Sequence, residues 1–373
     1  MRSTLVCFLF LAAIAMPAQE TPTQKALAFE RQGDWKQAED AWREAIQQKP
    51  ADGAAYAHLG LVLAREQNYA QATEAYRKAL ALKANLPGIE LDLGLALFKQ
   101  EKMAEAIAPL KAAAAKSPDN MQAQVLLGMS YYATAQYAEA LPYLKKAVEK
   151  SPDNLQLHTV LAQSCLWAKQ YDCTLEQYKQ ILLLNPESAQ ADILAGEALD
   201  GLNDADGAIR QFEAAAKASP TEPNVHFGLG YLLWKQHSYE QAAAQFKQEL
   251  SNDPNHVQAL TYLGDVNIKL NDNAAALPLL EKAVKLPGAP RIAFVDLGIL
   301  YADAGRHDDA IAAFQHAIQM DPSEVDAHWR LGRLYASMGR QQEAKAELAK
   351  ANELHKQKDQ PLATQMAPPN SSN

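Results

Sequence analysis

Apolar residues recur along this chain at the three- and four-residue spacing that places them on one face of a helix. Residues 121–154 show this pattern twice. The first face carries Leu127, Gly128, Tyr131 and Tyr132, and the second carries Tyr137, Ala140, Leu144, Ala147 and Val148. We therefore predict two amphipathic helices in this segment, joined by a short turn.

The same pattern repeats every 34 residues without an insertion or deletion. One phase of the period holds eight of the 17 glycines: Gly60, Gly94, Gly128, Gly196, Gly230, Gly264, Gly298 and Gly332. A unit of this length accommodates two helices of about 12–14 residues and two turns. Fixed self-similarity at this length predicts a solenoid of stacked helical hairpins, with ten units between residues 19 and 358.

The small residues of the period follow from packing. Gly128 and Ala140 are small because the two helices of a hairpin cross closely there. Ala147 is small because the second helix also contacts the next hairpin, and Pro152 ends that helix. Because two helices cannot bury both of their faces, each unit depends on its neighbours.

These residues resemble the tetratricopeptide repeat family, whose pattern is an aromatic, Leu-Gly, an aromatic, Ala, a large apolar residue, Ala and Pro. The unit at 291–324 matches it with Phe294, Leu297, Gly298, Tyr301, Ala310, Phe314, Ala317 and Pro322. The resemblance extends over the ten units. It implies an all-α fold, a right-handed superhelical solenoid of stacked helix-turn-helix repeats. It also implies a non-enzymatic scaffold for protein–protein interaction that needs no cofactor.

In this family the first helix of each repeat lines a concave groove. The resemblance implies nine partner-binding candidates here: Leu61, Leu95, Phe98, Met129, Tyr132, Trp167, Tyr231, Trp234 and Trp329. A protein or peptide is the expected partner. The alternative is a polysaccharide, because family members accompany exopolysaccharide export and exposed aromatic rings can stack on sugars. The sequence has features that suit both. The Lys and Asn with which cytosolic chaperone-binding members hold a carboxylate are absent from the matching positions.

The N-terminus predicts a cleavable signal peptide over residues 1–18. Arg2 supplies the positive end, and residues 5–14 form an apolar run too short to span a bilayer comfortably. Cleavage after Ala15 or Ala18 is expected, with Ala18 favoured. The protein would then be periplasmic or secreted and not stably inserted in a membrane. An uncleaved N-terminal membrane anchor is the alternative.

The charge balance makes nucleic acid an unexpected partner. The formal net charge is −9, and the sequence suggests neither a basic patch nor a basic stripe. Residues 359–373 are rich in Pro, Gln, Ser and Asn, a composition that predicts a disordered tail.

Two cysteines remain after signal cleavage. Cys165 and Cys173 lie at positions 11 and 19 of the unit 155–188, on opposite sides of the expected turn. In an oxidising compartment this placement predicts a disulfide across the hairpin. The alternative is two unpaired small residues in the core. No His and acid pattern accompanies them, so catalytic cysteine chemistry is not expected.

Histidines and acidic residues suggest no metal site. His158, His226 and His328 share position 4 of their units, where the family usually has an aromatic ring, and we expect half-buried rings in that role. No HxxxH or CxxC spacing occurs. The acidic stretch 187–206 predicts a solvated face, with a landing site for a basic segment as the alternative.

Overall fold

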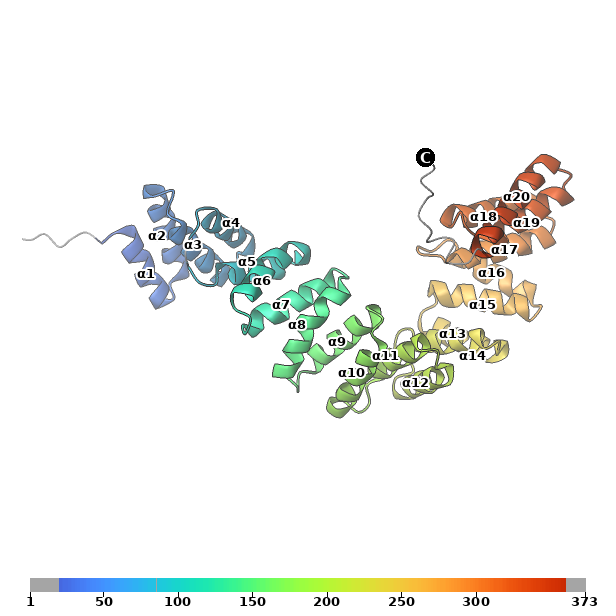
Figure 1. Cartoon of the computed structure of the whole chain (residues 1–373), viewed down its shortest axis with the longest axis horizontal. Coiled ribbons are helices and arrows are strands. Elements are labelled where there is room, and N and C mark those ends of the chain that lie inside the picture. The colour runs from blue at the N-terminus through green and yellow to red at the C-terminus, as the bar shows by residue number, and fades with distance from the viewer. Residues whose placement is uncertain (1–19, 85, 360–373) are drawn as a thin grey trace, which may run out of the picture. The chain divides into compact units, whose positions relative to one another are not determined.

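The computed structural model describes residues 20–84 and 86–359, with side chains as far as residue 357, and this part is helical throughout (Figure 1). The first nine helices are α1 (Pro22–Gln32), α2 (Trp35–Gln48), α3 (Gly53–Arg65), α4 (Tyr69–Ala81), α5 (Ile89–Lys99), α6 (Met103–Lys116), α7 (Met121–Ala133), α8 (Tyr137–Lys150) and α9 (Leu155–Trp167). The others are α10 (Tyr171–Leu184), α11 (Ala189–Gly201), α12 (Ala205–Ala218), α13 (Val225–Lys235), α14 (Tyr239–Asn252), α15 (Val257–Lys269), α16 (Asn273–Ala283), α17 (Arg291–Asp303), α18 (His307–Met320), α19 (Val325–Ser337) and α20 (Gln341–Asp359). The predicted all-α fold of helical hairpins is confirmed.

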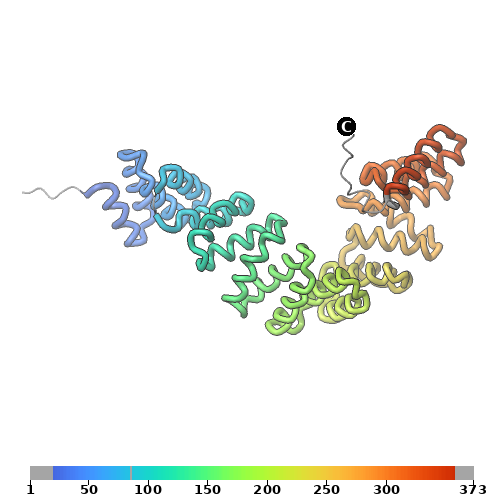
Figure 2. Tube along the Cα trace, viewed as in Figure 1, coloured from blue at the N-terminus to red at the C-terminus, as the bar shows by residue number. Residues whose placement is uncertain are grey.

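The chain divides into two compact units. Unit 1 ends at Ala168 and contains α1 to α9, and unit 2 begins at Lys169 and contains α10 to α20. The trace in Figure 2 follows both units from one hairpin to the next. The odd-numbered helices are the first helix of each repeat and are called A helices here, and the even-numbered ones are B helices.

Eight of the ten described hairpins are held together by close packing at a glycine of the A helix. A Cβ atom on Gly60 would lie 2.6 Å from the Tyr76 ring, and one on Gly298 would lie 2.5 Å from the Phe314 ring. Both distances are far below van der Waals contact, so only glycine permits the observed crossing of the A and B helices. This confirms the reason inferred from sequence for the small residue at this position.

The turn between helices A and B also repeats. A residue with positive φ occurs every 34 residues: Gly33, Gln67, Glu101, Ala135, Lys169, Asn203, His237, Asn271, Gly305 and Gly339. This left-handed residue ends the A helix and lets the chain reverse. Only three of the ten are glycine, and a non-glycine residue in this conformation costs about 1 kcal/mol. Tertiary packing therefore overrides local preference at most of these turns.

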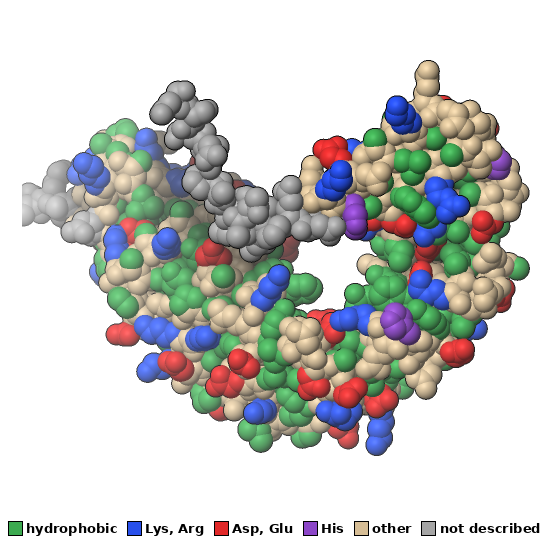
Figure 3. All heavy atoms as spheres, turned by 45° about the vertical axis from the view of Figure 1, so that its right-hand side comes forward, with side chains coloured by type: hydrophobic (Ala, Val, Ile, Leu, Met, Phe, Trp, Pro, Cys, Tyr) green, Lys and Arg blue, Asp and Glu red, His purple; other side chains and the backbone are tan. Residues whose placement is uncertain are grey.

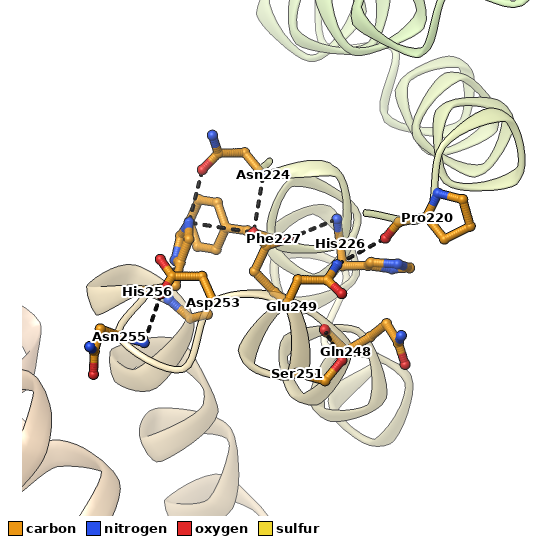
Figure 4. Close-up of polar contacts among 12 residues, drawn as sticks. Pro220, Asn224, His226, Phe227, Gln248, Glu249, Ser251, Asp253, Asn255 and His256 are labelled. Atoms are coloured by element: carbon orange, nitrogen blue, oxygen red, sulfur yellow. Dashed lines mark hydrogen bonds and ion pairs between the residues drawn. The ribbon is translucent and has the colours of Figure 1, made fainter. Parts of the chain in front are cut away.

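A buried carboxylate completes one hairpin of unit 2 (Figure 4). Glu249 of α14 is 2% exposed and accepts backbone N–H groups of Asn224, His226 and Phe227 at 3.0, 3.2 and 3.1 Å. These N–H groups belong to the first turn of α13 and lack partners within their own helix. Glu249 is thus a structural cap supplied by the neighbouring helix, stabilised by the positive end of the α13 dipole.

Several sequence predictions fall partly or wholly outside this description. The predicted signal peptide lies outside the described residues, as does the predicted tail from residue 360 onward. Among the helices that are described, none is long and apolar enough to cross a bilayer. Cys165 is buried, Cys173 is half-buried, and each is disulfide-bonded. That the two pair with each other stays a prediction.

Candidate functional site on the A helices

Successive A helices touch one another within each unit. Contacts join α3 to α5, α5 to α7 and α7 to α9 in unit 1, and α11 through α19 are joined in the same way in unit 2. Apart from α10 and α20, each B helix instead packs between its own A helix and the next one. The side chains of A helices that point away from the B helices therefore form one continuous surface in each unit, called here the A-helix face.

All nine predicted partner-binding residues lie on A helices, and none is buried. In unit 1 they are Leu61, Leu95, Phe98, Met129, Tyr132 and Trp167, and in unit 2 they are Tyr231, Trp234 and Trp329. Seven are half-buried, whereas the Trp167 and Trp329 side chains are 60% and 42% exposed. The structure groups some of them into pockets and aromatic clusters and leaves Phe98 and Met129 outside these groups.

Leu61 and Leu95 line a pocket of about 320 Å³ in unit 1. Its other lining residues are Ala64, Arg65, Tyr69, Tyr76, Asp92, Ala96, Lys99 and Gln122. A second pocket of about 170 Å³ shares three of these residues, Leu61, Tyr76 and Asp92, and is also lined by His58 and Pro87. The two pockets together offer apolar walls with two cations and one carboxyl group.

Asp92 lies where the two pockets meet. Its side chain is half-buried, and burial raises the pKa of the carboxyl group, while the nearby Arg65 lowers it. The hydrogen bonds and ion pairs of the described residues leave this carboxyl group without a partner. It is therefore available to a hydrogen-bond donor that enters either pocket.

Tyr132 and Trp167 belong to an aromatic group further along unit 1. The Tyr137 ring packs edge-on against Tyr132 and is stacked on Trp167, with centroid distances of 6.0 and 6.2 Å. The Tyr132 hydroxyl donates to Gln163 Oε1 at 2.6 Å, a contact between the A helices of adjacent repeats. One side of the group is thus fixed by packing, while Trp167 offers an exposed ring.

Tyr231 and Trp234 form a comparable group in unit 2. Their rings stack at 5.7 Å, and the Tyr262 ring meets them edge-on at 5.3 and 5.0 Å. Trp234 Nε1–H donates to Asp265 Oδ2 at 2.6 Å, and Asp265 Oδ1 lies 3.1 Å from Lys269 Nζ. Trp234 therefore links two A helices and also leaves part of its ring accessible to a partner.

A second carboxyl group lies close to this network. Asp296 is 5% exposed, and its Oδ2 atom has no hydrogen-bond partner in the described part of the chain. Burial raises its pKa to about 8, Asp265 adds to the increase, and Lys269 and Arg330 oppose it. Asp296 is therefore mostly protonated at neutral pH.

Trp329 lines a pocket of about 300 Å³ near the end of unit 2. Arg330, Arg333, Asp303 and His307 are among the other lining residues. The Arg333 guanidinium lies 4.9 Å from the centre of the Trp329 ring, a cation–π contact. Over the molecular face drawn in Figure 3, Lys and Arg are interspersed with Asp, Glu and hydrophobic side chains.

Comparisons with known proteins agree with this architecture. One tetratricopeptide repeat model matches residues 23–87, 91–155, 170–223 and 227–290, and a second matches residues 131–195 and 301–365. The chain belongs to the tetratricopeptide repeat family. Members of this family bind protein or peptide partners, and the chain is accordingly a protein-interaction scaffold.

Individual relatives are more distant. The CTR9 homolog of Arabidopsis thaliana is 30% identical over 123 residues, which are 32% of this tetratricopeptide repeat chain and only 11% of that protein. The Cut9–Hcn1 structure matches 92% of this chain and 89% of its own at 13% identity and a TM-score of 0.51. PilF of Pseudomonas aeruginosa matches 56% of this chain and 94% of its own at 18% identity and a TM-score of 0.50. These two structures share the fold.

Some sequence expectations need correction. Asp192 in the acidic stretch is buried and accepts a hydrogen bond from the Tyr178 hydroxyl at 3.2 Å, so the stretch is not wholly solvated. His158, His226 and His328 are buried rather than half-buried. Among the residues that the structure describes, no three His, Cys, Asp or Glu side chains are grouped to hold a metal ion.

Two features of the tetratricopeptide repeats were missed in the sequence. The pairs Tyr132–Gln163 and Trp234–Asp265 are both 31 residues apart, because position 12 of one repeat meets position 9 of the next. A search at this spacing would have found them. The second feature is a row of cations, Arg31, Arg65 and Lys99, at the same position of three consecutive repeats. The sequence analysis did not note this short row.

Proposed function

We propose that this protein is an exported, non-enzymatic scaffold that binds an extended segment of a partner protein on its A-helix face. The pocket lined by Leu61 and Leu95 supports this proposal most directly. Its apolar walls accept side chains, while Arg65, Lys99 and Asp92 provide groups for polar contacts. Such a mixture of apolar area and a few polar groups suits a peptide segment.

The rigidity of the A-helix face also favours binding. The hairpins fix the face through close helix crossings, so a partner orders few of the scaffold's own side chains on binding. Large aromatic residues such as Tyr132 and Trp234 supply anchors, and truncation of such an anchor costs about 2 kcal/mol of binding energy. Export belongs to this proposal and rests on Arg2, the apolar run at 5–14 and the small residues after it.

Site-specific photo-crosslinking in the native host tests the proposal. A photoreactive residue at Leu95 lies in the pocket, and a matched one at Lys111 lies on the exposed surface of α6. We expect Leu95 to crosslink to a defined protein that mass spectrometry identifies, and Lys111 not to. Equal crosslinking from both positions, or none from Leu95, would contradict binding at the A-helix face.

A polysaccharide ligand is a second candidate because of Trp167. Its ring is 60% exposed and lies on the Tyr137 ring, which is the kind of flat aromatic surface that stacks on sugars. Envelope oligosaccharides from the host should then change tryptophan fluorescence in the wild type and not in Trp167→Ala. An unchanged affinity in Trp167→Ala would remove this candidate.

A further inference from the structure

The A-helix face of unit 1 carries two parallel rows of side chains. Arg31, Arg65 and Lys99 stand in the last turn of α1, α3 and α5, exactly one repeat apart, and all three are exposed. Four residues before each cation lies a half-buried leucine: Leu27, Leu61 and Leu95. Two rungs of each row line the same pocket, so the rows lie side by side there.

The three cations have no carboxylate partner within ion-pair distance in the described part of the chain. The matching lysines of unit 2 are paired, because Lys235 lies 2.6 Å from Asp200 and Lys269 lies 3.1 Å from Asp265. Similar sequence positions therefore leave charges open in one unit and neutralise them in the other.

The reason for this difference can be read in unit 1. Where unit 2 places Asp265 four residues before Lys269, unit 1 has leucine before every cation. The residue that would match Asp200 for Arg65 is Glu30, but its carboxylate is bound by Trp42 Nε1–H at 2.6 Å and lies 3.2 Å from His58 Nδ1. Arg65 instead lies over the Trp35 ring at 6.0 Å.

The helix dipole gives only part of the explanation. A cation in the last turn of a helix is stabilised by the negative end of the dipole, which accounts for the type of charge at this position. It does not account for three open cations beside a row of leucines. A charged row next to an apolar row is complementary to a ligand with acidic and apolar side chains in turn.

We propose that these two rows bind a segment of a partner protein that carries both acidic and large apolar side chains. Its carboxylates contact Arg31, Arg65 and Lys99, and its apolar side chains contact the leucines. This inference rests on the proposed function and names the partner chemistry. Adjacent helices pack about 8–10 Å apart. An extended chain that rises about 3.1–3.3 Å per residue would place a carboxylate on successive rungs roughly every third residue.

Asp92 lies in the same pocket as Arg65 and Lys99. Burial raises the pKa of its half-buried carboxyl group, and the nearby Arg65 lowers it. A backbone N–H of the bound segment can donate to it. Nucleic acid fits less well, because a net charge of −9 and three cations give a weak field for phosphates, and leucines do not pair with a phosphate backbone.

Peptide display on the mature full-length protein tests the inference. A random twelve-residue library is selected on the wild type at about 150 mM salt, near a Debye length of about 8 Å. The best peptides are synthesised, labelled and titrated by fluorescence anisotropy. The same titrations are run on Arg31→Gln/Arg65→Gln/Lys99→Gln and on a control variant, Lys78→Gln/Lys111→Gln/Lys145→Gln. The control removes three exposed charges on B helices, at lysines that are not among the lining residues of either pocket.

We expect the selected peptides to carry two or more carboxylates about three residues apart, with apolar residues between them. The variant that removes the cation row, Arg31→Gln/Arg65→Gln/Lys99→Gln, should bind the peptides at least about tenfold more weakly, since each exposed ion pair contributes roughly two- to fivefold. The control variant should bind them as the wild type does. Circular dichroism should be unchanged in both. Arg65→Glu should weaken binding of an acidic peptide. Replacing the facing Glu of the peptide by Lys should restore the affinity of this variant.

Other outcomes separate this inference from the proposed function. Selected peptides that are neutral or basic would overturn the acidic partner and leave peptide binding intact. Wild-type affinity in Arg31→Gln/Arg65→Gln/Lys99→Gln would do the same. A twelve-nucleotide DNA strand that binds as tightly as the best peptide would also overturn it. If the selection yields no binding peptide, both this inference and peptide binding by the A-helix face are contradicted.

Discussion

The two units build similar A-helix faces and use their charged residues differently. Unit 1 leaves Arg65 and Lys99 open beside leucines, whereas unit 2 neutralises Lys235 with Asp200 and Lys269 with Asp265. The 31-residue contact is neutral in unit 1, from Tyr132 to Gln163, and ends on a carboxylate in unit 2, at Asp265. A repeat fixes where a side chain stands, and its neighbours decide whether it is free to bind: Asp200 of the preceding repeat pairs with Lys235, and Asp265 of the same helix pairs with Lys269.

The comparison predicts that the charged residues of unit 2 matter most for stability. The largest effect concerns Asp296, which faces Asp265 and Lys269 of α15 and Asp326 and Arg330 of α19. Its pKa in the folded protein, about 8, lies above the value of about 3.9 in an unfolded chain. The folded state therefore holds the proton more tightly, and the stability of this region falls as pH rises between these two values.

Measured against Asp296→Asn, which cannot ionise, the wild type should lose roughly 1 kcal/mol of local unfolding free energy per pH unit between pH 5 and 7. Hydrogen exchange of α15 and α17, corrected for the intrinsic pH dependence of exchange, measures this difference. Parallel profiles for the two proteins across that range would show that Asp296 does not titrate there.

Glu249→Ala should give the next largest loss. It removes the acceptor of three backbone N–H groups at the start of α13, of which that of His226 is buried, at a cost of up to about 3 kcal/mol. Protection of α13 and α14 from hydrogen exchange should fall, while that of α3 to α6 in unit 1 should not change. Wild-type protection in α13 would mean that Glu249 is not its cap.

At the turns the two units should behave alike. Ala135 has φ 57° in unit 1 and Gly305 has φ 72° in unit 2, where a Cβ atom would meet nothing within 4 Å. Ala135→Gly should therefore stabilise its unit by up to about 1 kcal/mol, and Gly305→Ala should destabilise its unit by a similar amount. Urea unfolding, followed by hydrogen exchange in each unit, gives both values. Changes of equal sign would contradict a purely backbone effect.

The smallest effect tests the charge comparison itself. Lys269→Gln breaks a partly buried ion pair and should cost up to about 1 kcal/mol. Arg65→Gln breaks no ion pair and loses only the 6.0 Å contact with the Trp35 ring, so it should cost less. The same unfolding measurement checks both variants. A larger loss in Arg65→Gln than in Lys269→Gln would show that the cations of unit 1 are structural.

The sequence predicted those parts of the fold that depend on local pattern. The 34-residue period indicated the helices, and the glycine at positions such as Gly60 and Gly298 indicated the close crossing of those hairpins that carry it. It also placed all nine predicted site residues on A helices. These features follow from spacing within one repeat, which a single sequence displays directly.

The features that were missed depend on contacts between repeats. The Glu30 carboxylate contacts Trp42 and His58, so it does not pair with Arg65. Asp192 is buried and hydrogen-bonded to Tyr178. A total charge of −9 also hid the row of three cations, because most of the acidic residues lie elsewhere in the chain. Residues such as Gln67 and Ala135 adopt positive φ under tertiary constraint, which their own propensities do not indicate.

The central claim is that the A-helix face of unit 1 binds a partner segment, and the affinity of a selected peptide for Leu61→Ala/Leu95→Ala tests it most directly. Both side chains are half-buried in the pocket lining, so their truncation should leave helical content unchanged. The account predicts affinity at least about tenfold weaker than that of the wild type, because two apolar contacts are lost. Wild-type affinity in this folded variant would contradict it.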